Sequence, residues 1–291
     1  METDQAPDQA PAEDKVRLAF RTCYLGDRFA GSQMQAGSRT VEGEFVAACM
    51  RLGLFPDWRS AGFYAAGRTD RGVHSRGQVY AFTTPHPDRA IAALNWQLPP
   101  DCWCTGYAIV GPQFHPRYDA RSRTYRYYFG EAELDYAAMD KASRSFCGSH
   151  NFTGFARAND KNPNRCVLSA KVAESGCGAF FEVRAESYLW HMVRYMAAAL
   201  VLVGEGRAGE SFIQARLAGD LSTLLGPASP EGLVLWDVDC GLGFVRLEAD
   251  DRSRRFVVAT KARHSVMVRV CEVLEPDENP VPGKGGYDGA L

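Results

Sequence analysis

An arginine lies inside the most apolar helix that the sequence predicts. That helix is expected over Leu189 to Val203, and Arg194 stands in it among methionine, valine and tyrosine residues. A buried guanidinium destabilises a fold unless a carboxylate meets it. The fold must therefore bring an acid to this helix, and Glu186, Glu205 or another local acid could serve.

The loop from Ala66 to His74 holds Asp70 between two arginines, with glycine on either side. Gly67 and Gly72 permit backbone angles and close approaches that a side chain would forbid. The apolar stretch that follows is typical of a strand that anchors the loop. The pattern indicates a rigid loop that presents a carboxylate, although a surface acid paired with a neighbouring arginine has the same pattern.

Apolar spacing predicts further strands and helices along the chain. Strands are expected over Val16 to Cys23, Cys102 to Val110, Cys166 to Glu174, Ala179 to Glu186, Leu233 to Val238 and Val266 to Leu274; helices are expected after the N-cap Thr40 and over Phe212 to Leu217. His191 is expected to serve in helix packing. The strand-helix-strand order recurs in both halves, which favours two α/β lobes.

We expect four regions along the chain. Residues 1–14 are polar and acidic and should be disordered, residues 15–113 should form an N-terminal lobe with the Asp70 loop, residues 114–275 a C-terminal lobe, and residues 276–291 a disordered tail. The basic run from Arg252 to Lys261 and Arg263 is either a solvated hairpin or an RNA-facing surface.

A strand rich in aromatic and basic residues is expected around Tyr125. Alternation places Tyr125, Tyr127 and Phe129 on one face, and Arg126 and Tyr128 on the other. Aromatic residues interleaved with arginine suit stacking on an unpaired base beside phosphate contacts. An aromatic core strand with solvated arginines fits the same pattern.

Composition limits the classes of function. The net charge of −2 argues against a uniformly basic nucleic-acid binder, so an RNA site would be a local patch. The nine cysteines include no Cys-x-x-Cys pair and are expected to be reduced core residues, without a zinc site or a thiolate nucleophile. No apolar run is long enough for a membrane helix and no signal peptide is visible, so a cytoplasmic protein is expected.

The loop Gly67 to His74, followed by Gly77-Gln78-Val79, closely resembles the signature Gly-Arg-Thr-Asp-x-Gly-Val-His of the tRNA pseudouridine synthase A (TruA-like) family. Further family motifs match in order at Asp27 to Gly31, Leu94 to Asp101, Arg123 to Tyr127, Tyr188 to Arg194 and Pro230 to Leu235. Two departures stand nearby: Ser32 occupies a position where the family usually has Trp, and Arg71 one where Ala is usual.

The resemblance implies an α+β pseudouridine synthase fold, with two ferredoxin-like (RRM-like) lobes whose antiparallel sheets join across a central active-site cleft. It implies isomerisation of uridine in tRNA anticodon stem-loops, at positions 38 to 40, by a homodimer. This reaction detaches uracil, turns it and reattaches it through C5, so no cofactor or metal is expected.

The resemblance also assigns residues. Asp70 would be the nucleophile, Arg194 its ion-pair partner, and Tyr125 would stack on uracil and could accept the C5 proton. Arg68 would fill the space of the flipped nucleotide or hold its phosphate, and Leu233 would form an apolar wall. Other substrate contacts are expected from Gln78, Arg121, Arg123 and Arg126.

Two other classes of protein are alternatives. A non-catalytic RNA-binding α/β module would need the aromatic strand but no acid opposite Arg194. A carboxylate-dependent hydrolase would need a second acid in an equivalent loop, and the sequence offers no counterpart to Asp70-Arg71-Gly72.

Overall fold

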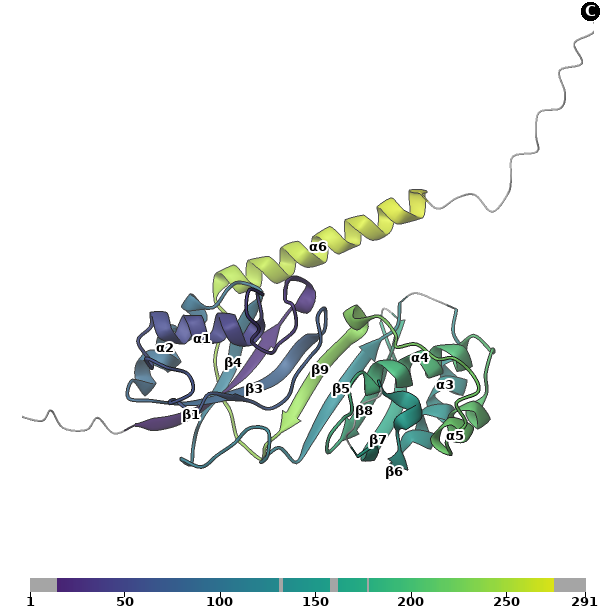
Figure 1. Ribbon diagram of the computed structural model, residues 1–291. Helices are drawn as coiled ribbons and strands as arrows, with labels where there is room; N and C mark the ends of the chain where they lie inside the picture. The colour runs from purple at the N-terminus through teal and green to yellow at the C-terminus, as the bar shows by residue number, and fades with distance from the viewer. Residues whose placement is uncertain (1–14, 131–132, 158–161, 177, 275–291) are drawn as a thin grey trace, which may run out of the picture.

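The computed structural model describes residues 15–130, 133–157, 162–176 and 178–274, so the expected disordered ends lie outside the described residues. Within this part of the chain, one ten-stranded mixed sheet runs across the molecule in the order β10-β4-β1-β3-β9-β5-β8-β7-β6, with β2 paired to β3 (Figure 1). The strands are β1 (Val16–Tyr24), β2 (Tyr64–Ala65), β3 (His74–Thr84), β4 (Cys102–Val110), β5 (Ser122–Tyr128), β6 (Gly148–Asn151), β7 (Asn164–Ser175), β8 (Gly178–Ala185), β9 (Leu233–Asp239) and β10 (Val245–Arg246).

A single parallel pairing joins the two halves of this sheet. The described strand pairs are antiparallel except for β3 and β9, where His74 faces Val234 and Ser75 faces Leu235. The Ser75 hydroxyl also donates to the Leu235 carbonyl at 3.3 Å. The expected fold class is thus confirmed, and the sheets of the two halves form one surface directly after the Asp70 loop.

Each half of the sheet carries its own helices and core. Helices α1 (Val41–Arg51) and α2 (Pro87–Gln97) cover the first half, while α3 (Tyr136–Ser143), α4 (Met192–Gly204) and α5 (Glu210–Leu217) pack on the second half (Figure 1). The expected cap of α1 is present, because the Thr40 hydroxyl accepts from the Gly43 N–H at 3.2 Å. The expected division into lobes at residue 113 stays a prediction.

A third, smaller core lies in the middle of the sheet. On β3, Tyr80 and Phe82 face the core under α1 and α2, whereas Val79 and Ala81 belong to this central cluster. Because neighbouring residues of a strand point to opposite faces, the central cluster lies on the face away from α1 and α2. Tyr125 packs against both this cluster and the core under α4.

The chain after β9 returns to the first half. The Leu247 N–H donates to the Thr105 carbonyl at 3.0 Å, and the Arg252 guanidinium donates to the carbonyls of Asn95, Trp96 and Leu98. Helix α6 (Asp251–Leu274) begins there and projects away from the molecule (Figure 1).

The expected strand over Val266 to Leu274 is wrong, since these residues form the second half of α6. The apolar pattern also fits a helix, because Val266, Val270 and Val273 fall on one helical face. At the start of α6, the Asp250 carboxylate accepts from the Ser253 N–H at 2.8 Å. No glycine or proline lies between Asp251 and Leu274 to end the helix earlier. The helix therefore continues.

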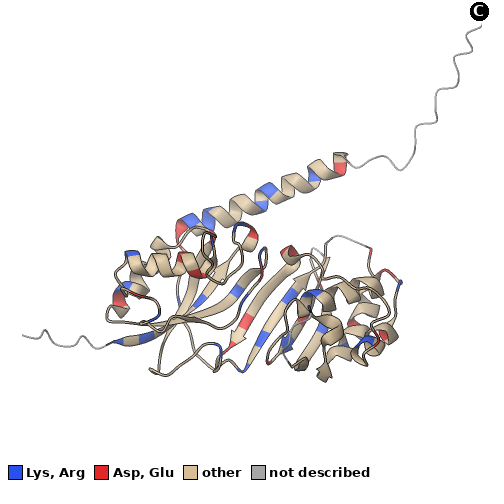
Figure 2. Cartoon of the chain, in the orientation of Figure 1, with Lys and Arg blue, Asp and Glu red and all other residues tan. Residues whose placement is uncertain are grey.

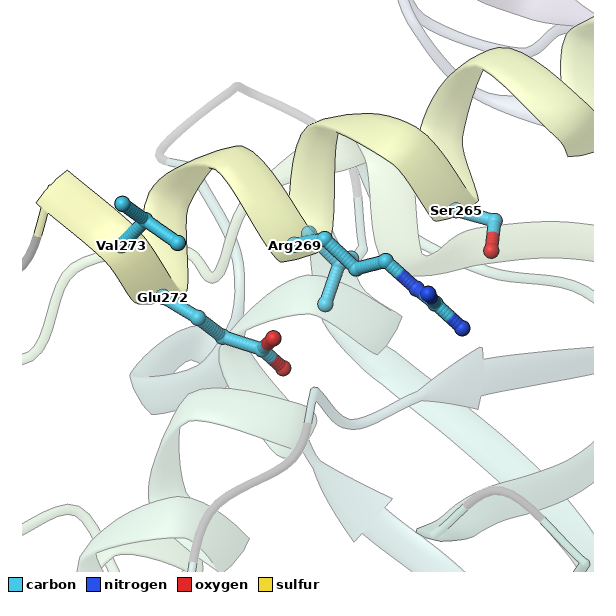
Figure 3. A pocket seen from close by; sticks show the side chains of 5 residues that line it. Ser265, Arg269, Glu272 and Val273 are labelled. Atoms are coloured by element: carbon cyan, nitrogen blue, oxygen red, sulfur yellow. The ribbon is translucent and has the colours of Figure 1, made fainter.

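The basic run likewise lies on α6 and not in a hairpin, and lysine and arginine recur along this helix (Figure 2). A shallow hollow beside it is lined by Ser265, Val268, Arg269, Glu272 and Val273 (Figure 3). All of these residues belong to α6, so the hollow is an exposed helix face and not an enclosed cavity.

Candidate active site

The Asp70 loop is a tight turn between β2 and β3. The Val73 N–H donates to the Asp70 carbonyl at 3.2 Å, and Gly72 adopts φ +82°. A side chain at Gly72 would be strained and would also lie 3.1 Å from Pro230. The buried Gln78 amide donates to the Gly67 carbonyl at 2.8 Å. Gln78, expected as a substrate contact, thus braces the loop from behind.

Ser32 supports the same loop from the other side, which sequence reasoning did not anticipate. It is fully buried, its hydroxyl accepts from the Thr69 N–H at 2.8 Å, and its own N–H donates to the Thr69 carbonyl at 3.0 Å. The Thr69 hydroxyl in turn lies 2.8 Å from the Tyr24 hydroxyl. A small hydroxyl residue at position 32 therefore fixes the residue next to Asp70.

Three N–H-bearing side chains surround the carboxylate of Asp70, whose side chain is 35% exposed. The Trp190 indole donates to Oδ1 at 3.2 Å, while the Nε2 atom of His191 lies 3.4 Å from Oδ2. The Nη1 atom of Arg194 lies 3.9 Å from the same Oδ2. The acid that meets Arg194 is thus Asp70, and His191, expected in helix packing, faces the carboxylate instead.

Arg194 is held mainly by a second contact. Its side chain is 13% exposed, and its Nε donates to the Ala228 carbonyl at 2.6 Å. The Ala228 N–H returns a bond to the Arg194 carbonyl at 3.0 Å. The arginine therefore ties α4 to the segment before β9 while one end of its guanidinium approaches Asp70.

Tyr125 stands on β5 at the junction of two cores. Its ring packs edge-on against Tyr188, with centroids 5.1 Å apart. Burial raises the pKa of Tyr125 to about 12, Arg123 opposes this rise, and the nearby Asp70 carboxylate adds to it. Tyr127 and Phe129 are buried in the core as their alternation predicted, and Leu233 is buried there too.

Arg123 braces the site and does not point to open solvent. Its guanidinium donates to the carbonyls of Ala66 at 2.9 Å, Glu186 at 2.8 Å and Arg117 at 2.6 Å. Burial lowers the pKa of Arg123. These bonds connect the loop before Asp70 with the segment that leads to α4. The Arg123 guanidinium, which was expected to contact the substrate, is thus hydrogen-bonded to backbone carbonyls.

Arg126 lies on the far face of the sheet. Its neighbours across the strand pair are Phe180 and Glu182, whereas Phe181 and Val183 belong to the core under α4. The Nε atom of Arg126 donates to Glu182 at 2.7 Å, and its guanidinium covers the Trp236 ring at 3.6 Å. The guanidinium of Arg126, an expected substrate contact, is thus occupied by Glu182 and Trp236 on the face opposite to the core under α4.

Arg68 and Arg121 are exposed. Within the described residues, neither guanidinium has a side-chain hydrogen bond or salt bridge, so both can reach a bound polyanion. His115 lies 4.3 Å from both Tyr64 and Tyr118, measured between ring centroids, and the two tyrosines are exposed. Open aromatic faces of this kind can stack on bases.

Comparison with known proteins places these features in a family. A family model described as tRNA pseudouridine synthase matches residues 142–239. The tRNA pseudouridine synthase A of Methanosphaerula palustris is 50% identical over 274 residues, which cover 94% of this chain and 97% of the relative. The chain belongs to the tRNA pseudouridine synthase A family. The family's protein from Methanoculleus marisnigri is 51% identical over 262 residues, or 90% of this chain and 97% of the relative.

More distant members of the tRNA pseudouridine synthase A family also align along most of their length. The protein of Thermococcus onnurineus is 39% identical over 263 residues, which cover 89% of this chain and 95% of the relative. Among solved structures, a Cbf5-Nop10-Gar1 complex matches with a TM-score of 0.33 and 13% identity over 64% of this chain and 45% of that one.

The family model covers the part of the chain that contains Trp190, His191 and Arg194, and it begins after Asp70 and Tyr125. Within the described residues, no three His, Cys, Asp or Glu side chains gather as a metal site would require. None of the described helices is long and apolar enough to cross a membrane.

Proposed function

We propose that Asp70 is the nucleophile that converts uridine to pseudouridine in the anticodon stem-loop of tRNA, at positions 38, 39 and/or 40. The coarser activity follows from family membership: the protein is an isomerase that acts on uridines of tRNA. The finer proposal is supported by the Asp70 carboxylate, which is partly exposed and held between donors from the start of α4.

The proposed reaction is an isomerisation. The bond between N1 and C1′ breaks, uracil turns, and a bond forms between C5 and C1′, while the C5 proton is lost and N1 gains one. One nucleophilic carboxylate can start this sequence, either by adding to uracil C6 or by attacking C1′. The Trp190 N–H that donates to Oδ1 and the His191 ring beside Oδ2 limit the direction in which the Asp70 carboxylate faces an incoming base.

The neighbours of Asp70 would handle the flipped nucleotide. Tyr125 would lie against uracil, and because its pKa is raised to about 12, its hydroxyl stays protonated at neutral pH. Stacking is therefore the role we propose for it in preference to accepting the C5 proton. Arg68 would occupy the vacated space in the RNA or contact its phosphate, and Leu233 would contribute to the apolar wall from within the core.

We further propose that tRNA is bound by a homodimer and that the protein works in the cytoplasm. Both proposals rest on the family's motifs in the sequence. Sedimentation equilibrium of the purified protein, with and without tRNA, measures the first: a single-chain mass at all concentrations would contradict it.

The function is tested with transcribed tRNAs that keep uridine at only one of positions 38, 39 and 40. Pseudouridine is mapped by carbodiimide modification and primer extension, in EDTA, on RNA folded beforehand. We expect pseudouridine at one or more of these positions and nowhere else. Binding without isomerisation would return the protein to the RNA-binding class, and strand cleavage would indicate a hydrolase.

A further inference from the structure

The residue immediately before α4 has an unusual backbone. His191 adopts φ +63°, and it is the one non-glycine residue with positive φ in the described part of the chain. Left-handed backbone is unfavourable for a residue with a side chain, and such strain persists where the surrounding structure enforces it, often at functional sites. The strain here lies beside Asp70.

The left-handed turn aims two consecutive side chains at one carboxylate. The Trp190 indole N–H reaches Oδ1 of Asp70 at 3.2 Å, and Nε2 of His191 lies 3.4 Å from Oδ2. Both distances are shorter than the 3.9 Å between Asp70 and Nη1 of Arg194, whose Nε is occupied by the Ala228 carbonyl. Trp190 and His191 are therefore the two side chains closest to the Asp70 carboxylate, and the arginine stands farther away.

Trp190 is held in place although it is 46% exposed. The Arg157 guanidinium lies 4.3 Å from the centre of its ring, and the Arg157 N–H donates to the Trp190 carbonyl at 3.0 Å. A solvated tryptophan fixed from behind by an arginine has its indole N–H in a defined direction. In the structure, this indole N–H donates to Asp70.

Burial favours the neutral form of the His191 imidazole. Burial lowers the pKa of His191, Arg194 and Arg157 lower it further, and Asp70 opposes them. A neutral imidazole has one N–H, and the tautomer protonated on Nε2 presents it to Oδ2 of Asp70, 3.4 Å away.

We propose that Trp190 and His191 form a carboxylate clamp, a pair of positioning residues that fixes both oxygens of Asp70 for attack on the nucleotide. This inference rests on the proposed role of Asp70 as nucleophile. The clamp adds no contact to RNA, and it acts by holding the nucleophile in the productive direction, because small misplacements of reacting groups can slow catalysis by about 100-fold.

The test uses His191→Gly and Trp190→Phe in the full-length protein. Glycine adopts φ +63° without strain, so His191→Gly removes the imidazole while the backbone keeps its turn. Phenylalanine keeps a ring for Arg157 to cover and removes only the N–H. Trp96→Phe, at a 60% exposed tryptophan in the first half of the chain, is the matched control.

Single-turnover rates on tRNA should fall about 10- to 100-fold for His191→Gly and less for Trp190→Phe, with tRNA affinity within about threefold of wild type. Added imidazole should restore part of the rate of His191→Gly, and its melting temperature should not fall. Trp96→Phe should match wild type.

Wild-type rates in both clamp variants would overturn the proposal. So would rate losses that follow a loss of melting temperature or tRNA affinity without rescue by imidazole, because they would mark a packing role. These outcomes are separate from failure of the proposed function, which would appear as wild-type protein that does not isomerise tRNA or Asp70→Asn protein that still does.

Discussion

Arg194 approaches Asp70 at the limit of ion pairing, with 3.9 Å between Nη1 and Oδ2. A partly exposed pair at this separation has a weak charge interaction compared with a bidentate contact. The stronger bond of Arg194, at 2.6 Å, goes to the Ala228 carbonyl. Removal of Arg194 should therefore affect both the fold and the surroundings of Asp70.

Arg194→Met should nearly abolish activity and lower the free energy of unfolding. The double mutant with Asp70→Asn should recover only the part of this stability loss that arises because Asp70 is left without a charge partner. The other part remains, since the Ala228 carbonyl still lacks its donor. We expect a coupling energy of about 0.5–1 kcal/mol from urea denaturation of all four proteins. Strictly additive stability effects would show that the two charges are not coupled.

Asp70→Asn alone should abolish isomerisation while tRNA affinity stays within about tenfold of wild type, because the amide keeps the shape of the side chain and removes its nucleophilicity. Single-turnover assays at saturating protein measure the first effect and filter binding the second. Appreciable residual activity would rule out the nucleophile assignment.

Tyr125→Phe should retain most activity, and Tyr125→Ala should lose transition-state stabilisation worth about 1–3 kcal/mol, because only the second change removes the stacking ring. The raised pKa, about 12, keeps the hydroxyl protonated below that pH. The wild-type rate should therefore show no ionisation of Tyr125 between pH 7 and 9. Equal activity of all three proteins would leave Tyr125 as a core residue only.

Ser32→Ala should destabilise the protein by about 1–3 kcal/mol, because the buried Thr69 N–H loses its acceptor. Activity at low temperature should also fall, since the residue next to Asp70 gains freedom. Thermal and urea unfolding compare this variant with Ser38→Ala, an exposed serine. Equal stability of the two variants would show that the Thr69 contact contributes nothing.

Arg68→Gln should weaken tRNA binding and lower the slope of log affinity against log salt by about 1, as expected for one lost phosphate contact. Arg126→Gln is the control from the far face of the sheet, where the guanidinium is occupied by Glu182 and Trp236. It should reduce stability and leave the salt slope unchanged. An unchanged slope in Arg68→Gln would remove Arg68 from the RNA contacts.

Local sequence patterns predicted strands correctly where the strand pairs with other strands of the sheet. Strand β4 has the predicted bounds, Cys102 to Val110, and every second residue from Cys102 to Ala108 is buried. Val266 to Leu274 misled the same reasoning because nothing in a local pattern says whether a partner strand is present. Alternation also placed Arg126 and Tyr125 on opposite faces of the sheet, and the structure has them there.

The site was predictable where a motif carried it and not where backbone geometry did. The motifs named Asp70 and Arg194, and the structure brings them within 4 Å. His191 was missed because the helix was predicted to begin at Leu189, whereas α4 begins at Met192 and the left-handed backbone of His191 has no signal in the sequence. Ser32 was noted only as a departure, since its bonds to Thr69 join segments distant in the sequence.

The parallel pairing of β3 with β9 determines when the site can exist during synthesis. The bond from Ser75 to Leu235 spans 160 residues, and Asp70 reaches its partners on α4 only when the sheet is closed there. In a chain still emerging from the ribosome, the edge of β3 at His74 and Ser75, which β2 does not cover, stays open until β9 has been made. Such an edge can pair with other chains, so rapid completion of translation should protect this protein from aggregation. The pairing that removes this open edge also joins the Asp70 loop to the half of the sheet that carries α4.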